Sequence, residues 1–159
     1  MFPTAYTVVF FGHRHMERSV KAEKQLEEEI YRLMKEKRYV VFLTGRNGEF
    51  DLLVSSVITR LREQFRNDNS SLVLLLPYRS ADYEKNREFY LNYYTEVEFC
   101  EAASAAYPKA AIMIRNREMA DRADLVLCYV EKETGGAWKA VRYAKELGKE
   151  IINLAGDLP

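Results

Sequence analysis

The 159-residue chain is poor in the residues and segments that mark several classes of protein. It has only seven glycines and four prolines beside 48% hydrophobic and 30% charged residues, which excludes a collagen-like or disordered chain. No apolar run is as long as a membrane-spanning helix, which needs about 18 residues. The N-terminal segment lacks the early basic residues of a secretory leader. We therefore expect a cytoplasmic protein without membrane contact, with a single domain over residues 1–159.

Cysteine and net charge are also scarce. Cys100 and Cys128 show no CxxC spacing and no histidine at metal-ligand spacing, so we expect two buried thiols in a reducing compartment and no metal site. The 24 Lys and Arg residues balance 24 Asp and Glu residues. Because non-specific nucleic-acid binding needs surplus positive charge, this balance disfavours nucleic acid as a partner, although it leaves a local basic pocket open.

What the chain does contain is an alternation of strand-like and helix-like segments from end to end. Apolar, β-branched and aromatic runs predict buried strands, and apolar residues three or four apart predict helices. The predicted strands are residues 7–11, 39–43, 72–76, 96–100, 124–130 and 151–154, and the predicted helices are residues 19–37, 54–65, 82–90, 112–123 and 137–147, the last closed by Gly148. This order predicts an α/β fold, a three-layer sandwich with a mainly parallel sheet.

Three loops with glycine follow predicted strands, at the edge where doubly wound sheets bind ligands. The first contains Gly12, His13 and Arg14, which combine a tight turn with donors suited to an anion such as phosphate. A basic surface loop without a ligand is the alternative. The third contains Thr134, Gly135 and Gly136 and opens the last predicted helix, where it is either an anion-binding helix N-terminus or a flexible turn.

The second glycine loop offers the ligand-binding candidates Gly45, Asn47, Gly48, Glu49 and Asp51. Asp51 is either the N-cap of the next helix or, like Glu49, an acceptor of hydrogen bonds from ribose hydroxyls. The loop is neither a Walker A motif nor a GxGxxG fingerprint, so no nucleoside-triphosphatase activity and no cofactor is expected.

The helix before the strand at 124–130 contributes a further pair of candidates, Arg115 and Asn116. Arg115 shares its helix face with Met119 and is therefore predicted to point inward, where an arginine needs a partner or an anionic ligand. Arg117 and Asp121, four residues apart, are expected to form a surface ion pair.

The order of these motifs resembles the SLOG superfamily, a Rossmann-like group. It includes cytokinin-activating phosphoribohydrolases, the DNA-processing protein DprA and small stand-alone bacterial proteins, of which the YpsA-like branch is the most similar in size and motif order. The resemblance covers nearly the whole chain and implies a Rossmann-like nucleotide-binding frame.

The resemblance implies a role for Arg115 but not the hydrolase chemistry of the family. Residues 115–124 reproduce the Arg, Met and Asp spacing of the hydrolases, so Arg115 falls on an arginine with a catalytic role. Their next motif, Pro-Gly-Gly-x-Gly-Thr-x-x-Glu, corresponds to residues 134–142. The glycine pair is kept, a tryptophan and a lysine replace the following glycine and threonine, and Arg142 occupies the position of the catalytic glutamate.

Our first functional interpretation is a binding module, a sensor or carrier for a nucleotide-like small molecule. The glycine loops would hold phosphate, and an aromatic face for the base would come from Phe50, Tyr78, Tyr129 or Trp138.

The alternative is a hydrolase of nucleotide N-glycosidic bonds, for which the catalytic candidates are Arg115, Glu49 and Asp51, since that chemistry needs a carboxylate. A third interpretation, a DprA-like nucleic-acid-associated protein, is disfavoured by the charge balance. The sequence leaves open whether the chain forms a homo-oligomer.

Overall fold

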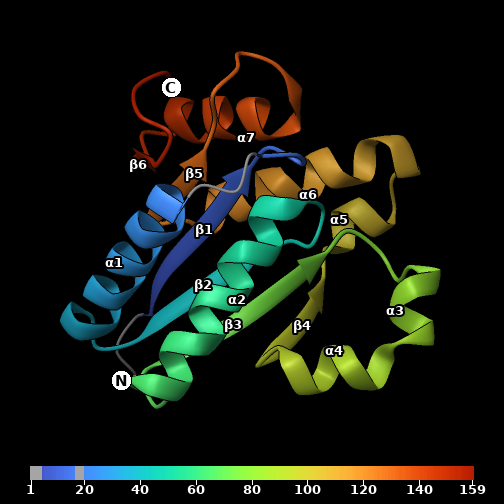
Figure 1. Ribbon diagram of the computed structural model, residues 1–159. Coiled ribbons are helices and arrows are strands. Elements are labelled where there is room, and N and C mark those ends of the chain that lie inside the picture. Colours follow the sequence, from blue (N-terminus) through green and yellow to red (C-terminus); the bar gives the residue numbers. More distant parts are fainter. Residues whose placement is uncertain (1–4, 17–19) are drawn as a thin grey trace.

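A computed structural model describes residues 5–16 and 20–159, and its elements alternate in the predicted order (Figure 1). The strands are β1 (Tyr6–Gly12), β2 (Val40–Thr44), β3 (Ser70–Leu76), β4 (Glu96–Phe99), β5 (Leu125–Tyr129) and β6 (Glu150–Asn153). The helices are α1 (Val20–Glu36), α2 (Glu49–Gln64), α3 (Ala81–Lys85), α4 (Arg87–Tyr93), α5 (Glu101–Ser104), α6 (Pro108–Arg122) and α7 (Gly135–Glu146). Within this described part of the chain, no helix is both long and apolar enough to cross a membrane. Residues 1–4 of the N-terminal segment and the predicted helix start at residue 19 lie outside the described residues.

The strands form one parallel sheet in the order β4-β3-β2-β1-β5-β6, which confirms the predicted α/β fold with a mainly parallel sheet. The chain moves outward from β1 to β4 and then returns to the other side of β1 for β5 and β6. The strand order therefore reverses between β1 and β5, where Gly12 stands opposite Tyr129 in the register. Such a switch point leaves a crevice beyond the carboxyl ends of the strands.

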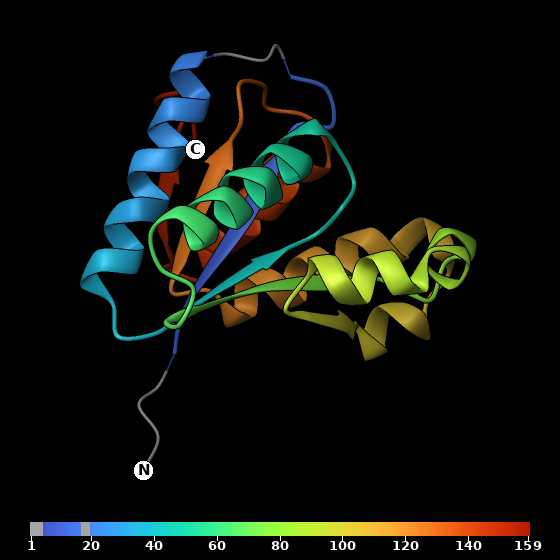
Figure 2. The same ribbon diagram turned by 60° about the horizontal axis from the view of Figure 1, so that its bottom comes forward.

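Helices cover both faces of the sheet and complete three layers (Figures 1 and 2). α1 and α2 lie on one face, and α6 and α7 lie on the other. In β1, Val8 and Phe10 belong to the first core cluster, whereas Val9 and Phe11 belong to the second. Because successive side chains of a strand point to opposite faces, a strand buried on both faces is apolar throughout.

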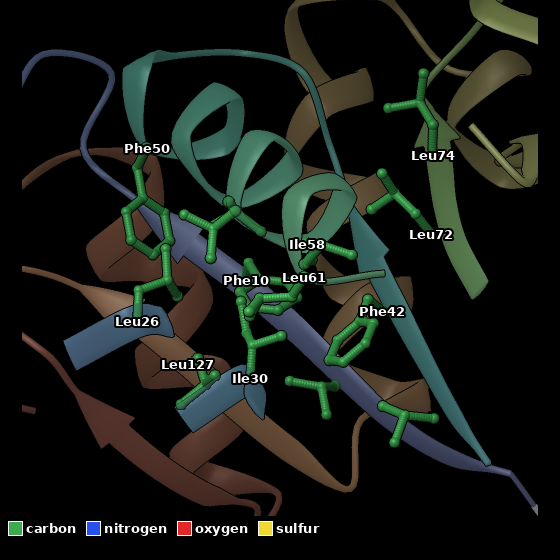
Figure 3. Packing of buried hydrophobic residues seen from close by; sticks show 14 of the residues in the cluster. Phe10, Leu26, Ile30, Phe42, Phe50, Ile58, Leu61, Leu72, Leu74 and Leu127 are labelled. Atoms are coloured by element: carbon green, nitrogen blue, oxygen red, sulfur yellow. The ribbon is translucent and has the colours of Figure 1, made fainter. Parts of the chain in front are cut away.

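The core between α1, α2 and the sheet fixes the start of α2 at the carboxyl edge (Figure 3). Leu26 and Ile30 from α1 and Phe50 from α2 pack with Phe10 of β1 and Leu127 of β5, and all five are buried. Phe50 is the second residue of α2, so its burial anchors the loop before that helix beside β1. A Cβ at Gly12 would collide with the Phe50 ring, which explains the glycine at the end of β1.

The structure differs from the sequence prediction mainly between β3 and α6. The helix predicted over residues 82–90 is divided at Asn86 into α3 and α4. Ser80 is the N-cap residue of α3, and its side chain accepts a hydrogen bond from the Tyr83 N–H at 3.1 Å. The short helix α5 was not predicted. The glycine signal after α7 is confirmed: Gly148 has a φ of +77°, and the N–H groups of Gly148 and Lys149 close a Schellman motif on Lys145 and Ala144.

Candidate functional site

A pocket of about 280 Å³ lies at the carboxyl ends of β1 and β2, beside the switch point of the sheet. All three glycine loops and α6 contribute to it. The predicted residues in its lining are Gly12, His13, Arg14, Gly45, Asn47, Gly48, Asp51, Arg115, Asn116, Gly135 and Gly136. Sequence reasoning did not assign Phe10, Phe11, Ile112, Met119 and Ala137 to the pocket. Phe11 and Ala137 adjoin predicted residues, Ile112 and Met119 lie one helical turn from Arg115, and Phe10 lies two positions before Gly12 in β1. That spacing was the available signal.

Two predicted ligand-binding residues lie outside the lining of this pocket. Glu49 Oε2 accepts a hydrogen bond from the Met16 N–H at 2.9 Å, and Oε1 lies 4.0 Å from His15 Nδ1. Glu49 therefore fastens the loop after β1 to the start of α2 and borders a separate hollow. Thr134 is the exposed N-cap residue of α7, and its side chain makes no capping hydrogen bond.

Arg115 is a buried cation in the wall of the pocket, 2% exposed, as its helix face predicted. Its Nη1 donates to the Leu75 carbonyl oxygen at 2.9 Å, and its Nε donates to Asn116 Oδ1 at 3.0 Å. Among the described residues, no carboxylate oxygen forms an ion pair with it within 4.0 Å. Burial lowers the pKa of this guanidinium from its ordinary value, and the Asp51 charge partly offsets the shift.

Gly45, at the end of β2, provides the space that Arg115 occupies. A Cβ at this position would lie 2.7 Å from Arg115 Nη1 and 2.9 Å from its Cζ. Any larger residue would therefore push the guanidinium out of its place. Gly45 was predicted to leave room for a ligand, and in the structure it leaves room for the Arg115 side chain.

Asp51 lies in the pocket but is not the N-cap of α2, so that prediction is wrong. The helix begins at Glu49 with Gly48 as its N-cap residue, which places Asp51 in the third helical position. From there Oδ2 reaches back and accepts the Asn47 N–H at 3.0 Å, so the carboxylate satisfies a donor one residue before the cap. Burial raises the pKa of Asp51, although the Asn47 hydrogen bond and the Arg115 charge oppose the shift.

The loop after β1 is tied to its neighbours by backbone contacts. The Glu49 N–H donates to the Arg14 carbonyl oxygen at 2.9 Å, and Arg14 Nε donates to the Asn47 carbonyl oxygen at 3.2 Å. A Cβ at Gly48 would lie 2.5 Å from Arg14 Cα, so glycine permits this approach. His13 Nε2 accepts the Glu131 N–H at 2.9 Å, which requires the proton of a neutral imidazole on Nδ1.

The first turn of α7 presents backbone to the pocket, whereas the following side chains turn away. Gly135 has a φ of +91°, and no atom lies within 4 Å of a Cβ placed at Gly135 or Gly136. Trp138 packs partly against the α6–α7 core, and Arg142 lies over its ring at 5.5 Å. Arg142, at the position of the hydrolase glutamate, is thus outside the pocket lining.

The aromatic faces suggested for a base are not in the pocket. Phe50 and Tyr129 are 1% and 8% exposed and pack against each other with ring centroids 6.3 Å apart. They are core residues, so that suggestion was wrong for both. Tyr78 is exposed and Trp138 half-buried, and neither lines the pocket.

On the outer side of α6, the predicted ion pair between Arg117 and Asp121 does not form within 4.0 Å in the described structure. Asp121 Oδ1 accepts the Tyr143 hydroxyl at 2.7 Å, and the Arg117 guanidinium lies over the Tyr143 ring at 5.4 Å. Tyr143 from α7 thus separates the two charges.

The two cysteines are buried thiols, as predicted. Burial raises the pKa of Cys128 to about 12 and also raises the pKa of Cys100. No group of three or more His, Cys, Asp or Glu side chains among the described residues is arranged to hold a metal ion.

No family model and no curated protein matches this chain. Its fold is similar to two solved structures of DNA processing protein A (DprA). The structure from Streptococcus pneumoniae has a TM-score of 0.64 and 16% sequence identity over 92% of this chain and 49% of that chain. The structure from Helicobacter pylori, described for its single-stranded DNA binding mode, has a TM-score of 0.63 and 15% identity over 93% of this chain and 64% of that chain. The chain thus spans about half of the first relative and less than two thirds of the second, and identities this low establish likeness of fold.

The expectation that nucleic acid is disfavoured as a partner is wrong. The solved structures similar to this fold include one described as binding single-stranded DNA. A net charge of zero is a sum over the whole surface, and binding depends on where the cations are placed. The balance of 24 against 24 charges therefore excludes no nucleic-acid partner.

Proposed function

We propose that this chain is a binding module that holds the phosphate of a nucleotide or nucleotide-derived molecule in the pocket at the carboxyl edge of the sheet. The observation that supports the proposal is the buried Arg115 guanidinium, whose hydrogen-bond partners in the described structure are neutral oxygens. A buried cation that forms no ion pair within 4.0 Å among the described residues is stabilised by an anion, and phosphate oxygens match the planar fork of a guanidinium.

Two further groups in the pocket lining support phosphate as that anion. The first turn of α7 offers unpaired N–H groups and the positive end of the helix dipole, and Gly135 and Gly136 leave its backbone open to close approach. Arg14 lies at the exposed side of the lining, and its Nε is fixed by Asn47. We assign its terminal nitrogens to the outer phosphate oxygens.

The sugar of such a ligand would lie toward Asp51. Among the described lining residues, Asp51 is the single carboxyl side chain, and a carboxyl oxygen accepts hydrogen bonds from ribose hydroxyls. The apolar wall from Ile112, Met119 and Ala137 is suited to the less polar part of the ligand.

The same arrangement favours binding over the alternative of N-glycosidic hydrolysis. A hydrolase needs an ionised carboxylate to activate water or to stabilise oxocarbenium charge. Glu49 and Arg142 lie outside the lining, while burial raises the pKa of Asp51, and Oδ2 already accepts a hydrogen bond. We therefore infer a sensor or carrier, organised as one cytoplasmic domain of the YpsA-like type.

A second candidate ligand is a single strand of nucleic acid. Its sugar–phosphate unit presents the same phosphate and sugar groups as a free nucleotide. The likeness in fold to the Helicobacter pylori DprA, described as a single-stranded DNA-binding protein, favours this candidate.

Calorimetric and thermal-shift titrations of the purified protein test the proposal. The probes are 5′-AMP, GMP, CMP and UMP, each matched with its unphosphorylated nucleoside, and a 20-residue oligothymidylate for the second candidate. We expect at least one phosphorylated probe to raise the unfolding temperature and its nucleoside partner to have no effect. Equal responses to a nucleotide and its nucleoside would contradict a phosphate site.

Chromatography of the same mixtures after long incubation tests for turnover. We expect no free base to accumulate. Sustained release of base that Asp51→Asn abolishes would instead support the hydrolase.

A further inference from the structure

Another hollow, distinct from the one beside Glu49, continues from the pocket between α6 and α7, which cover the same face of the sheet. It holds about 400 Å³ and shares Ile112, Asn116 and Gly136 with the pocket lining. Figure 1 shows α6 and α7 on the side of the sheet opposite α1. Because the two cavities have walls in common, a ligand that extends from the pocket past Gly136 enters this α6–α7 groove.

Each wall of the α6–α7 groove is one stripe of a helix, with residues three or four positions apart. The α6 stripe is Lys109, Ile112, Met113, Asn116 and Arg117, and the α7 stripe is Gly136, Lys139, Ala140 and Tyr143. At 1.5 Å per residue the α6 stripe is about 12 Å long. That length exceeds the about 3.4 Å that one nucleotide adds along a stacked strand.

The α6–α7 groove is positively charged although the chain as a whole is neutral. Lys109, Arg117 and Lys139 are exposed, and its described lining contains no acidic side chain. None of the three cations has an ion pair within 4.0 Å among the described residues. The nearby Asp121 carboxylate accepts the Tyr143 hydroxyl.

We propose that the α6–α7 groove is a second phosphate subsite, so that the ligand contains at least two nucleotide units. This inference rests on the proposed function of the pocket. One phosphate binds beside Arg115 and Gly136, and the next lies between Lys139 of α7 and Lys109 of α6. Free dinucleotides and nucleic-acid strands both present this chemistry, two sugar–base units joined through anionic phosphate.

Calorimetric titration of the full chain with AMP and with the 5′-phosphorylated diadenylate pApA tests the subsite. We expect pApA to bind about tenfold more tightly than AMP, since a second anion gains charge-assisted contacts. Lys139→Gln should weaken pApA about three- to tenfold and leave AMP within about twofold, because an exposed cation contributes less than a buried one. It should also make the affinity for pApA less dependent on salt concentration, since one charge contact is lost.

Lys145→Gln is the matched control, since Lys145 is an exposed lysine of the same helix outside the groove lining. It should change neither affinity. Lys109→Gln repeats the test from the other wall and keeps it decisive if Lys139→Gln does not fold. Equal affinities for AMP and pApA, or equal losses from Lys139→Gln and Lys145→Gln, would overturn the subsite and leave phosphate binding in the pocket intact.

Two further probes distinguish a free dinucleotide from a nucleic-acid strand as the ligand. Diadenosine diphosphate binding as tightly as pApA identifies a small dinucleotide, whereas affinity that rises further with strand length identifies nucleic acid. Both results support the subsite. Failure of every phosphorylated probe to bind the folded wild-type protein would instead refute the proposed function itself.

Discussion

Replacing Arg115 by methionine tests whether this arginine binds a ligand or only stabilises the fold. Methionine keeps much of the aliphatic volume, so the change removes the charge without a large cavity. The guanidinium donates to the Leu75 carbonyl and to Asn116 Oδ1, and charge-assisted bonds of this type contribute about 1.5–3 kcal/mol each. Against them stands the desolvation of a buried ion, which costs several kcal/mol. Since these terms nearly cancel, we expect the free energy of unfolding to change by less than about 2 kcal/mol.

Binding should respond differently, because Arg115→Met removes the cation that faces the phosphate. The expected loss of affinity for a mononucleotide is about tenfold to a hundredfold, equivalent to about 1.4–2.7 kcal/mol. Urea unfolding followed by the fluorescence of Trp138, the single tryptophan, gives the stability, and calorimetry gives the affinity. The control is Arg122→Met on the same helix, whose exposed guanidinium pairs with Glu98 and Glu118 and should not affect binding. A drop of about 3–5 kcal/mol in stability with unchanged affinity would refute the reasoning, since that is the signature of a structural ion.

Three further predictions concern the residues around Arg115 and the buried thiols. Gly45→Ala places a Cβ 2.7 Å from the Arg115 guanidinium and should lower the free energy of unfolding in urea by about 1–3 kcal/mol. It should also weaken nucleotide binding, and unchanged affinity would show that the guanidinium can move without loss of binding. Burial raises the pKa of Asp51, so its ionised form destabilises the fold above that raised pKa, and the cost disappears as pH falls through it toward the ordinary value of about 3.9. Asp51→Asn should therefore raise the melting temperature at pH 7 and have little effect below about pH 3.9, and a gain that persists in acid would argue against the carboxylate as its cause. Cys100 and Cys128 should resist Ellman's reagent at pH 8 in the native protein and react fully in urea, because burial raises the pKa of both thiols, that of Cys128 to about 12. Rapid reaction of the native protein would contradict their burial.

The fold could be predicted from the sequence because its signals are local and repeated. A short apolar, β-branched and aromatic run such as residues 7–11 is typical of a strand buried on both faces of a sheet. The parallel sheet follows from the alternation of strands and helices. The division of residues 82–90 into two helices was missed because the break at Asn86 involves no proline or glycine. Aromatic packing in this segment, such as Tyr83 against Tyr90 at 5.4 Å, is tertiary and leaves no periodic pattern.

The candidate site was predicted in its location more than in its details. Three loops after strands converge on one edge in any parallel sheet, and the inward position of Arg115 followed from its helix face. Asp51 was expected either at the ligand or at the N-cap of α2, and the N-cap alternative failed because the helix begins at Glu49, which makes Asp51 an inward side chain of its first turn. The displacement of Glu49 from the pocket depends on its hydrogen bond to Met16, a loop contact that spacing alone does not reveal.

Backbone amide spectra of the ¹⁵N-labelled protein, recorded during titration with AMP and separately with adenosine, test the central claim most directly. We predict that AMP shifts the amide signals of Gly12, Gly45, Gly135 and Gly136, which come from three separate parts of the chain that converge on this pocket. Adenosine at the same concentration should leave those signals in place, since the site recognises phosphate. Saturable AMP shifts confined to residues outside the pocket, or identical shifts with AMP and adenosine, would contradict a phosphate site at this edge of the sheet.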